Sequence, residues 1–194
     1  MSGAARARLF VALDLPEDAR EAMAAWGREV AAPDGAERRL RLIPPNALHV
    51  TLCFLGWRDE GQAGEIGALT LGAVGENAAA APALALGAAA WLPPRRPRVL
   101  AVDLADEDGA LAGMQARVSD ALEARAAFEP EKRPFRPHVT VARVPRGARA
   151  GGREELAAPA PLRFPGAAVT LYRSRLSGAG AQYEPLARAE LGER

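Results

Sequence analysis

The chain contains two histidines, and each of them begins the same short phrase. His49 opens His-Val-Thr-Leu, and His138 opens His-Val-Thr-Val. The unperturbed pKa of histidine lies closest to neutrality, so imidazole is the natural proton carrier in acid–base chemistry. Two imidazoles, each followed two residues later by a threonine hydroxyl, indicate one active site assembled from two equivalent halves.

The two phrases lie 89 positions apart, and the same offset aligns a second pair of segments. It places Phe10–Leu15 on Val99–Leu104, with Ala, Asp and Leu identical at corresponding positions. One shift that aligns separate segments is the mark of an internal duplication. We therefore expect residues 1–194 to form a single domain of two pseudo-symmetric lobes.

Composition limits the class of protein. Of the 194 residues, 49% are hydrophobic and 25% are charged, which is ordinary for a globular domain. The net charge of +1 predicts no nucleic-acid partner by itself, so any basic site must be local. Cys53 is the sole cysteine, which excludes an intramolecular disulfide and favours a reducing compartment. With neither a signal-peptide pattern nor a run of ~18 apolar residues, we expect a cytoplasmic protein that does not contact membranes.

Hydrophobic periodicity predicts an α+β fold in which a strand–helix–strand unit occurs twice. Each lobe is expected to be an antiparallel sheet with helices on its outer face, and the active-site cleft lies between the lobes. The expected strands are Arg8–Leu15, His49–Gly56, Leu84–Trp91, Val99–Leu104, His138–Val144, Leu162–Ser174 and Gln182–Leu191. The expected helices are Pro16–Val30, Arg58–Asn77 and Asp108–Ala127.

Strand alternation places each histidine and its threonine on one face, with aliphatic residues on the other. If the lobes are related by a pseudo-two-fold axis, the two polar faces meet across a cleft. The same alternation places Cys53 beside His49 and Thr51. It places Arg143 on the opposite face from His138, unless a bulge re-aims it.

This set of groups suits in-line displacement at a phosphodiester. A neutral imidazole takes a proton from the attacking water, and the opposite imidazolium protonates the leaving oxygen. Threonine hydroxyls donate hydrogen bonds to the non-bridging oxygens as charge develops there. We expect no metal and no cofactor, since two histidines fall short of the three protein ligands typical of catalytic zinc. Composition and spacing leave open which histidine is the acid.

The surrounding sequence narrows the choice of family. The segments RLFVALDLP, HVTLCFLG, RPRVLAVDL, FRPHVTVAR and LYRSRLSGAGAQYEPL resemble the 2H phosphoesterase superfamily. Within it they resemble the RNA 2′,3′-cyclic phosphodiesterases, historically called 2′-5′ RNA ligases, from about Arg6 to Leu186. The resemblance implies metal-independent hydrolysis of an RNA 2′,3′-cyclic phosphate terminus to a 2′-phosphate, with 2′-5′ ligation as the reverse reaction.

The resemblance also assigns catalytic roles. His49 matches the proton donor to the departing 3′ oxygen, and His138 matches the proton acceptor that activates water. Thr51 and Thr140 match the residues that hold the phosphate oxygens.

Further residues are assigned to substrate binding. Arg143 matches the family's phosphate-binding arginine, and Phe10 matches an aromatic beside the terminal base. The remaining residues of this set are Phe54, Arg98 and Arg136. Sequence reasoning leaves alternatives open, because Arg98 also suits a solvated loop and both phenylalanines also suit a core.

We expect RNA 3′ ends with a 2′,3′-cyclic phosphate as the partner of a monomeric enzyme. Two alternatives remain at this point: a phosphodiesterase of the same superfamily that acts on a small cyclic nucleotide, and a non-catalytic module that binds RNA ends. Paired histidines disfavour the second, because lysine or arginine binds phosphate more simply at neutral pH.

Overall fold

The computed structural model describes residues 5–31, 40–75, 80–126, 128–145, 147–148, 156–177 and 180–192. The elements in chain order are β1 (Arg6–Asp14), α1 (Glu17–Ala31), β2 (Arg41–Leu42), η2 (Pro45–Ala47), β3 (His49–Asp59), η3 (Glu60–Gln62), α2 (Ala63–Val74), β4 (Ala83–Leu92), β5 (Val99–Ala105), α3 (Ala110–Arg125), β6 (His138–Arg143), β7 (Arg163–Pro165), β8 (Ala168–Ser177) and β9 (Gly180–Glu190), where η marks a single 3₁₀ turn. None of the described helices is long and apolar enough to cross a membrane.

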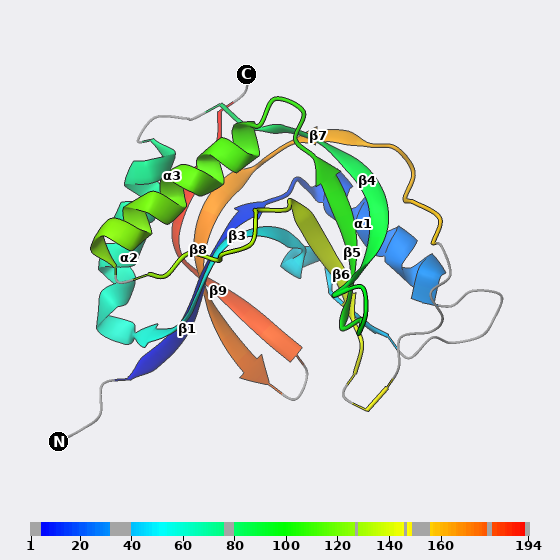
Figure 1. The fold of residues 1–194 in the computed structure, drawn as a ribbon, viewed down its shortest axis with the longest axis horizontal. Helices are drawn as coiled ribbons and strands as arrows, with labels where there is room; N and C mark the ends of the chain where they lie inside the picture. The colour runs from blue at the N-terminus through cyan, green and yellow to red at the C-terminus, as the bar shows by residue number, and fades with distance from the viewer. Residues whose placement is uncertain are drawn as a thin grey trace.

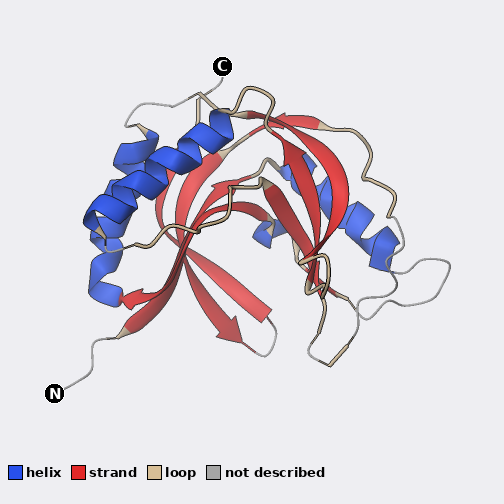
Figure 2. Cartoon of the chain, viewed as in Figure 1, coloured by secondary structure: helices blue, strands red, loops and turns tan. Residues whose placement is uncertain are grey.

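The strands form one antiparallel sheet in the order β7-β4-β5-β6-β3-β1-β8-β9, and β2 pairs with β6 beside β3. The sheet curls into an arch that opens toward the bottom of the view in Figure 1. Helices α2 and α3 lie together at one side of the arch, and α1 lies at the other (Figure 2). The expected α+β fold of two lobes is confirmed, and the two sheets of the lobes are continuous with each other.

The two histidine strands, β3 and β6, pair directly at one position, and β2 of the first lobe pairs with β6 beside it. Val50 of β3 pairs with Val139 of β6 in antiparallel register, and these two valines are separated by the duplication offset. A residue that pairs with its own duplicate in an antiparallel ladder lies beside a local two-fold axis. The axis places His49 across from Thr140, and Thr51 across from His138.

Each histidine strand contains a bulge at the equivalent position. Thr51 and Cys53 of β3 pair with two consecutive residues of β1, Ala12 and Val11. Leu52 between them has no partner and is therefore the extra residue. Val141 is the extra residue between β5 and β6. A bulge reverses the alternation of side chains beyond it. The two strands therefore show the same burial sequence over their first six residues.

The bulges correct two expectations that assumed unbroken alternation. Cys53 does not lie beside His49, because its side chain turns into the core and is only 3% exposed. Arg143 returns to the face that carries His138 and Thr140. Phe54, which is the duplicate of Arg143, is exposed at the corresponding place on β3.

Each lobe's first helix packs on the other lobe's histidine strand. Helix α1 packs against β6, where a Cβ built on Gly27 would lie 2.5 Å from Cγ1 of the bulge residue Val141. Helix α3 packs against β3, where Gln115 Nε2 donates a hydrogen bond to the carbonyl oxygen of the other bulge residue, Leu52, at 3.4 Å. The helices thus support both bulges from the core side.

Strand pairing explains two differences from the sequence prediction. Arg58 and Asp59, expected at the start of a helix, instead extend β3 because they pair with Ala7 and Arg6 of β1. The expected strand Leu162–Ser174 is two strands, because β7 pairs with β4 whereas β8 pairs with β1 and β9. Pairing with partners distant in the sequence decides both outcomes.

We predict opposite effects of alanine at two helix glycines. Gly27→Ala forces α1 away from Val141, so we expect the free energy of unfolding to fall by about 1–3 kcal/mol, as for overpacked cores. Gly72→Ala in α2 has no atom within 4 Å of the new Cβ. It should raise the free energy of unfolding by about 0.5–1 kcal/mol through helix propensity. Urea denaturation measures both, and equal effects at the two sites would contradict this packing.

Candidate active site

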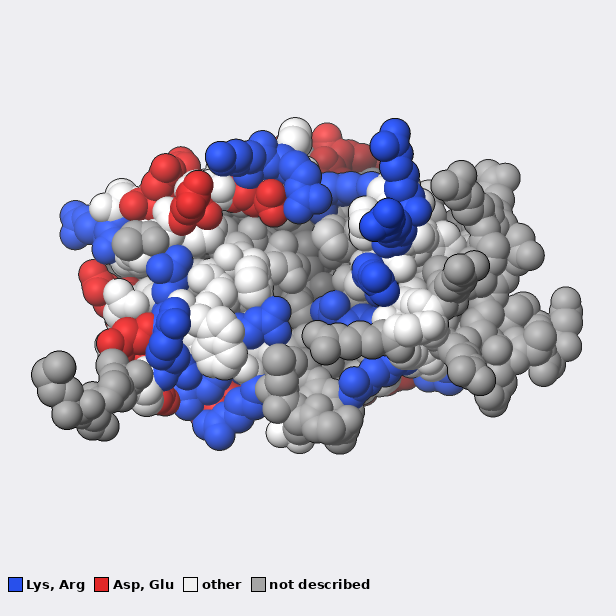
Figure 3. All heavy atoms as spheres, turned by 60° about the horizontal axis from the view of Figure 1, so that its bottom comes forward, with Lys and Arg blue, Asp and Glu red and all other residues white. Residues whose placement is uncertain are grey.

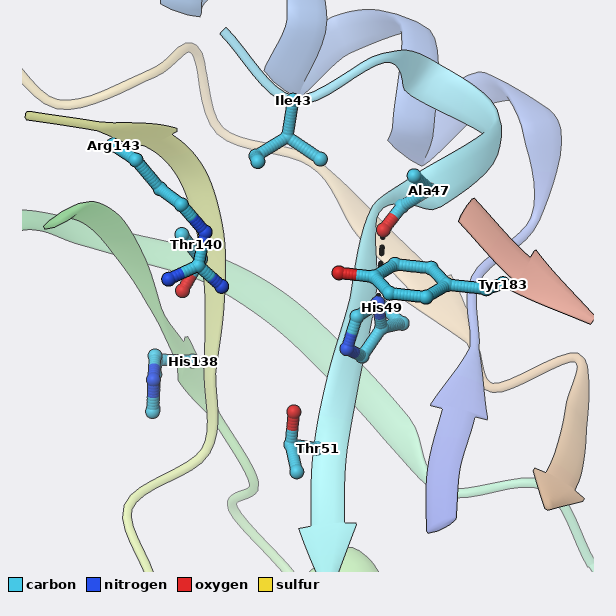
Figure 4. Close-up of a pocket in the computed structure, with 8 residues that line it drawn as sticks. All are labelled: Ile43, Ala47, His49, Thr51, His138, Thr140, Arg143 and Tyr183. Carbon is cyan, nitrogen blue, oxygen red and sulfur yellow. Dashed lines mark hydrogen bonds between the residues drawn. The ribbon is translucent and has the colours of Figure 1, made fainter. Parts of the chain in front are cut away.

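A pocket of about 40 Å³ lies between the two histidine phrases (Figure 4). It brings together five residues assigned from the sequence: His49, Thr51, His138, Thr140 and Arg143. The side chains come from β3 on one side and β6 on the other. Ile43, Ala47 and Tyr183 complete the lining.

The two imidazoles are oriented by equivalent hydrogen bonds. Nδ1 of His49 lies 2.8 Å from the carbonyl oxygen of Ala47, and Nδ1 of His138 lies 2.8 Å from that of Arg136. Because a carbonyl oxygen only accepts, each Nδ1 carries a proton and donates it. Each Nε2 is therefore left for substrate, as an acceptor when the ring is neutral and as a donor when it is protonated.

The surroundings of the two histidines differ. The His49 ring lies 5.0 Å from the Phe10 ring and 5.3 Å from the Tyr183 ring, which stands nearly perpendicular to it. Burial among these rings lowers the pKa of His49 below its ordinary value of 6.5. The Ala47 carbonyl and the Asp14 charge oppose this shift, whereas Arg143 and His138 add to it.

Each histidine also has an aspartate opposite it in the neighbouring strand. Asp14 pairs with His49 and accepts hydrogen bonds from Thr170, Tyr172 and Arg188. Burial, followed by the charge of Asp14 and the hydrogen bond to it, raises the pKa of Tyr172 to about 12 and keeps this hydroxyl a donor. These contacts hold the Asp14 carboxylate close to the His49 side of the site.

The duplicate of Asp14 is Asp103, which pairs with His138. Its carboxylate receives two hydrogen bonds from Arg136, at 2.9 Å and 2.5 Å. Arg136 was assigned to substrate binding, but both of its bonds go to this carboxylate and it does not line the pocket. Arg136 thus fixes the Asp103 carboxylate beside β6, as Arg188 fixes the Asp14 carboxylate beside β3.

A second hollow, of about 230 Å³, adjoins the first on the His49 side. The two share Ala47, His49 and Tyr183. The remaining lining is formed by Asp14, Leu15, Arg20, Asn46, Leu48, Tyr172, Pro185 and Arg188. Arg20 and Arg188 bring positive charge to the lining of this hollow.

The other sequence-assigned residues lie outside the small pocket. Phe10 is only 4% exposed, because its ring is covered by His49, Tyr172 and Tyr183. In this structure the Phe10 ring packs against His49, and its expected place beside a base stays a prediction. Arg98 is an exposed residue whose backbone groups bond to Leu92 and Val144.

Tyr183 is the functional residue that sequence reasoning missed. It comes from β9, more than 130 residues beyond His49, and neither histidine phrase points to it. The available signal was the segment LYRSRLSGAGAQYEPL, which contains both tyrosines of the chain. In the structure both tyrosine rings lie beside Phe10. No group of three His, Cys, Asp or Glu side chains suited to a metal ion occurs in the described ranges.

The chain matches a known protein family over most of its length. Residues 15–178 match the family model of the 2′-5′ RNA ligase superfamily. The chain belongs to this superfamily. The expected family is thereby confirmed, and membership supports phosphodiesterase activity. None of the curated protein sequences matches the chain.

Several solved structures are similar to this chain over nearly its whole length. TT0787 of Thermus thermophilus is 28% identical with a TM-score of 0.74, and the match covers 95% of this chain and 97% of that one. Escherichia coli LigT in complex with 3′-AMP is 26% identical with a TM-score of 0.76, covering 97% and 100%. The MHV ns2 PDE domain, at 14% identity and a TM-score of 0.62 over 92% and 99% of the chains, shares the fold.

We predict that Cys53 is chemically inert and dispensable for catalysis. Burial raises the pKa of its thiol to about 12, so the native protein should not react with a thiol-specific disulfide reagent at pH 8. Cys53→Ala should keep kcat within about twofold of the parent, since the side chain faces the core. Rapid labelling of the native protein, or a kcat loss of tenfold or more in a folded variant, would contradict this placement.

Proposed function

We propose that this protein hydrolyses RNA 2′,3′-cyclic phosphate termini to 2′-phosphomonoesters by two-histidine acid–base catalysis without a metal. The observation that carries the proposal is the pair of two-fold-related imidazoles, each with Nε2 left free, that line one small pocket with two threonines and an arginine. The reverse reaction at this site is 2′-5′ ligation, in keeping with the family description.

The proposed roles follow the geometry of in-line displacement. His138 Nε2 accepts a proton from water as the water oxygen bonds to phosphorus. On the opposite side the bond between phosphorus and O3′ breaks, and His49 Nε2 donates its proton to O3′. Thr51 and Thr140 donate hydrogen bonds to the non-bridging oxygens, and Arg143 balances their negative charge.

The donor role requires His49 to be protonated when substrate is bound. In the free protein, burial lowers the pKa of His49, so its imidazole is mostly neutral at pH 7. An anionic phosphate beside Nε2 favours the protonated ring and acts against this shift. Substrate binding and protonation of His49 are therefore coupled in the proposed mechanism.

The larger hollow suits the terminal nucleoside. It adjoins His49, whose proton goes to O3′ of that nucleoside, and it is lined by Tyr172, Tyr183 and Arg20. The LigT structure in complex with 3′-AMP supports a ribonucleotide as the class of ligand, because 3′-AMP carries phosphate on the ribose.

The test is hydrolysis of a short RNA ending in a 2′,3′-cyclic phosphate, in excess EDTA, with the product assigned by ³¹P NMR. We expect a 2′-phosphate. Removing either proton carrier in His49→Ala or His138→Ala should lower kcat by about 10²–10⁴. Thermal unfolding of each variant serves as the control for folding. Near-parental turnover in either folded variant, or a 3′-phosphate product, would exclude this mechanism.

We also predict the pH dependence of kcat/KM. The catalytically competent free enzyme carries protonated His49 and neutral His138, so at alkaline pH kcat/KM should fall in proportion to the fraction of His49 that is protonated. Asp14→Asn removes a charge that raises the pKa of His49, so the alkaline limb of the profile should move downward, to a lower kcat/KM at each pH. The control is Glu190→Gln, which changes a carboxylate that bonds to the same Arg188 as Asp14 does. A limb that stays in place or moves upward in Asp14→Asn would contradict the prediction.

A further inference from the structure

Two large hydrophobic side chains are exposed within the described part of the chain, and they lie close together. Phe54 is 51% exposed and Trp57 is 56% exposed. Both belong to β3, the strand that also carries His49 and Thr51. Exposed aromatic rings that stand together on a globular surface mark a binding site more often than isolated ones do.

Pairing places both rings on the concave face of the sheet. Phe54 pairs with Phe10, and Trp57 pairs with Arg8, across the β1–β3 ladder. Directly paired residues point to the same face, and the Phe10 ring packs beneath His49 on the concave face. Alternation along β1 puts Arg8 on that face with Phe10.

Arg8 adds positive charge to these rings. Its guanidinium carbon lies 4.8 Å from the centre of the Phe54 ring. We call Arg8, Phe54 and Trp57 the aromatic patch. Figure 3 shows the face that lies at the bottom of Figure 1, where basic side chains lie around the middle and acidic side chains gather toward the upper and left edges. Aromatic rings beside a guanidinium match the stacked bases and phosphates of a single nucleic-acid strand.

The position of the patch along β3 identifies the part of a substrate that would reach it. The larger hollow adjoins the N-terminal end of β3, the small pocket follows at His49 and Thr51, and the patch lies beyond the pocket. In a ribose with a 2′,3′-cyclic phosphate, the base is on C1′ and the preceding nucleotide is linked through C4′ and C5′. The base and the upstream strand therefore extend from opposite ends of the C2′–C3′ edge that carries the cyclic phosphate.

The span along the strand fits more than one nucleotide. Thr51 pairs with Ala12 and Trp57 pairs with Arg8, so this span covers four residues of β1, or roughly 13 Å at ~3.3 Å per residue. Stacked nucleotides advance by ~3.4 Å per step. With the terminal base in the larger hollow, the upstream strand runs from the pocket toward Phe54 and Trp57.

We propose that the aromatic patch binds the nucleotides immediately 5′ of the terminal one and thereby makes the enzyme prefer an RNA strand over a cyclic mononucleotide. This inference rests on the proposed function and adds a binding site to it. The occupant is a single-stranded RNA segment, because the patch is continuous with the phosphate pocket and carries positive charge.

The test compares two substrates, 2′,3′-cyclic AMP and an eight-nucleotide RNA with the same terminal nucleotide and cyclic phosphate. Wild-type protein should show a lower KM for the oligonucleotide. Trp57→Ala should raise that KM at least about fivefold, with kcat and the mononucleotide KM unchanged, and Phe54→Ala should raise the oligonucleotide KM by a similar factor. Trp57→Phe, which keeps an aromatic face, should restore most of the preference and is the matched control.

A second readout does not require turnover. The oligonucleotide with a 2′-phosphate end should quench tryptophan fluorescence, and this quenching should be absent in Trp57→Phe. Equal KM values for the two substrates in the wild type, or unchanged oligonucleotide KM in both alanine variants, would overturn the inference.

The experiment separates failure of the inference from failure of the proposed function. If neither substrate is hydrolysed, the proposed function fails. The inference about the patch is then decided by the affinity for the 2′-phosphate oligonucleotide. Equal affinity of the wild type and Trp57→Ala would overturn it. Sedimentation velocity tests the other occupant. A wild-type dimer that Trp57→Ala dissociates, with oligonucleotide binding unchanged, would assign the patch to self-association and overturn the inference.

Discussion

The antiparallel pairing of Val50 with Val139 is the constraint on which the site depends. Because each valine is the duplicate of the other, this pairing places a local two-fold axis between the lobes. Two copies of one short phrase then face each other, and the pairing of β2 with β6 beside them strengthens the joint between the lobes. Both valines are buried, so the joint that sets the spacing of the histidines is part of the core.

The duplication repeats backbone geometry but not surroundings. The bulges, the Nδ1 hydrogen bonds and the aspartates opposite the histidines all recur at the same offset. The rings around His49 do not: Phe10, Tyr172 and Tyr183 cluster on one lobe. Equal backbone placement is therefore combined with unequal burial, which lowers the pKa of His49 and gives the two imidazoles different surroundings.

Sequence reasoning reached the parts of the site that are encoded locally. The repeated phrase identified the histidines and threonines, and strand alternation placed each pair on one face. Sequence reasoning failed where pairing with a second strand decides the direction of a side chain. The orientation of Cys53 depends on a bulge that exists only because β1 and β3 pair with unequal numbers of residues. Tyr183 reaches the pocket through the curl of the sheet, which no local pattern encodes.

The most direct test of the two-histidine account is the hydrolysis of a 2′,3′-cyclic substrate whose bridging 3′ oxygen is replaced by sulfur. A thiolate leaves without protonation far more readily than an alkoxide does, since a thiol has a pKa near ~8.5. We expect this substitution to restore turnover to His49→Ala and not to His138→Ala. Restoration in His138→Ala instead, or in neither variant, would contradict the assignment of His49 as the acid.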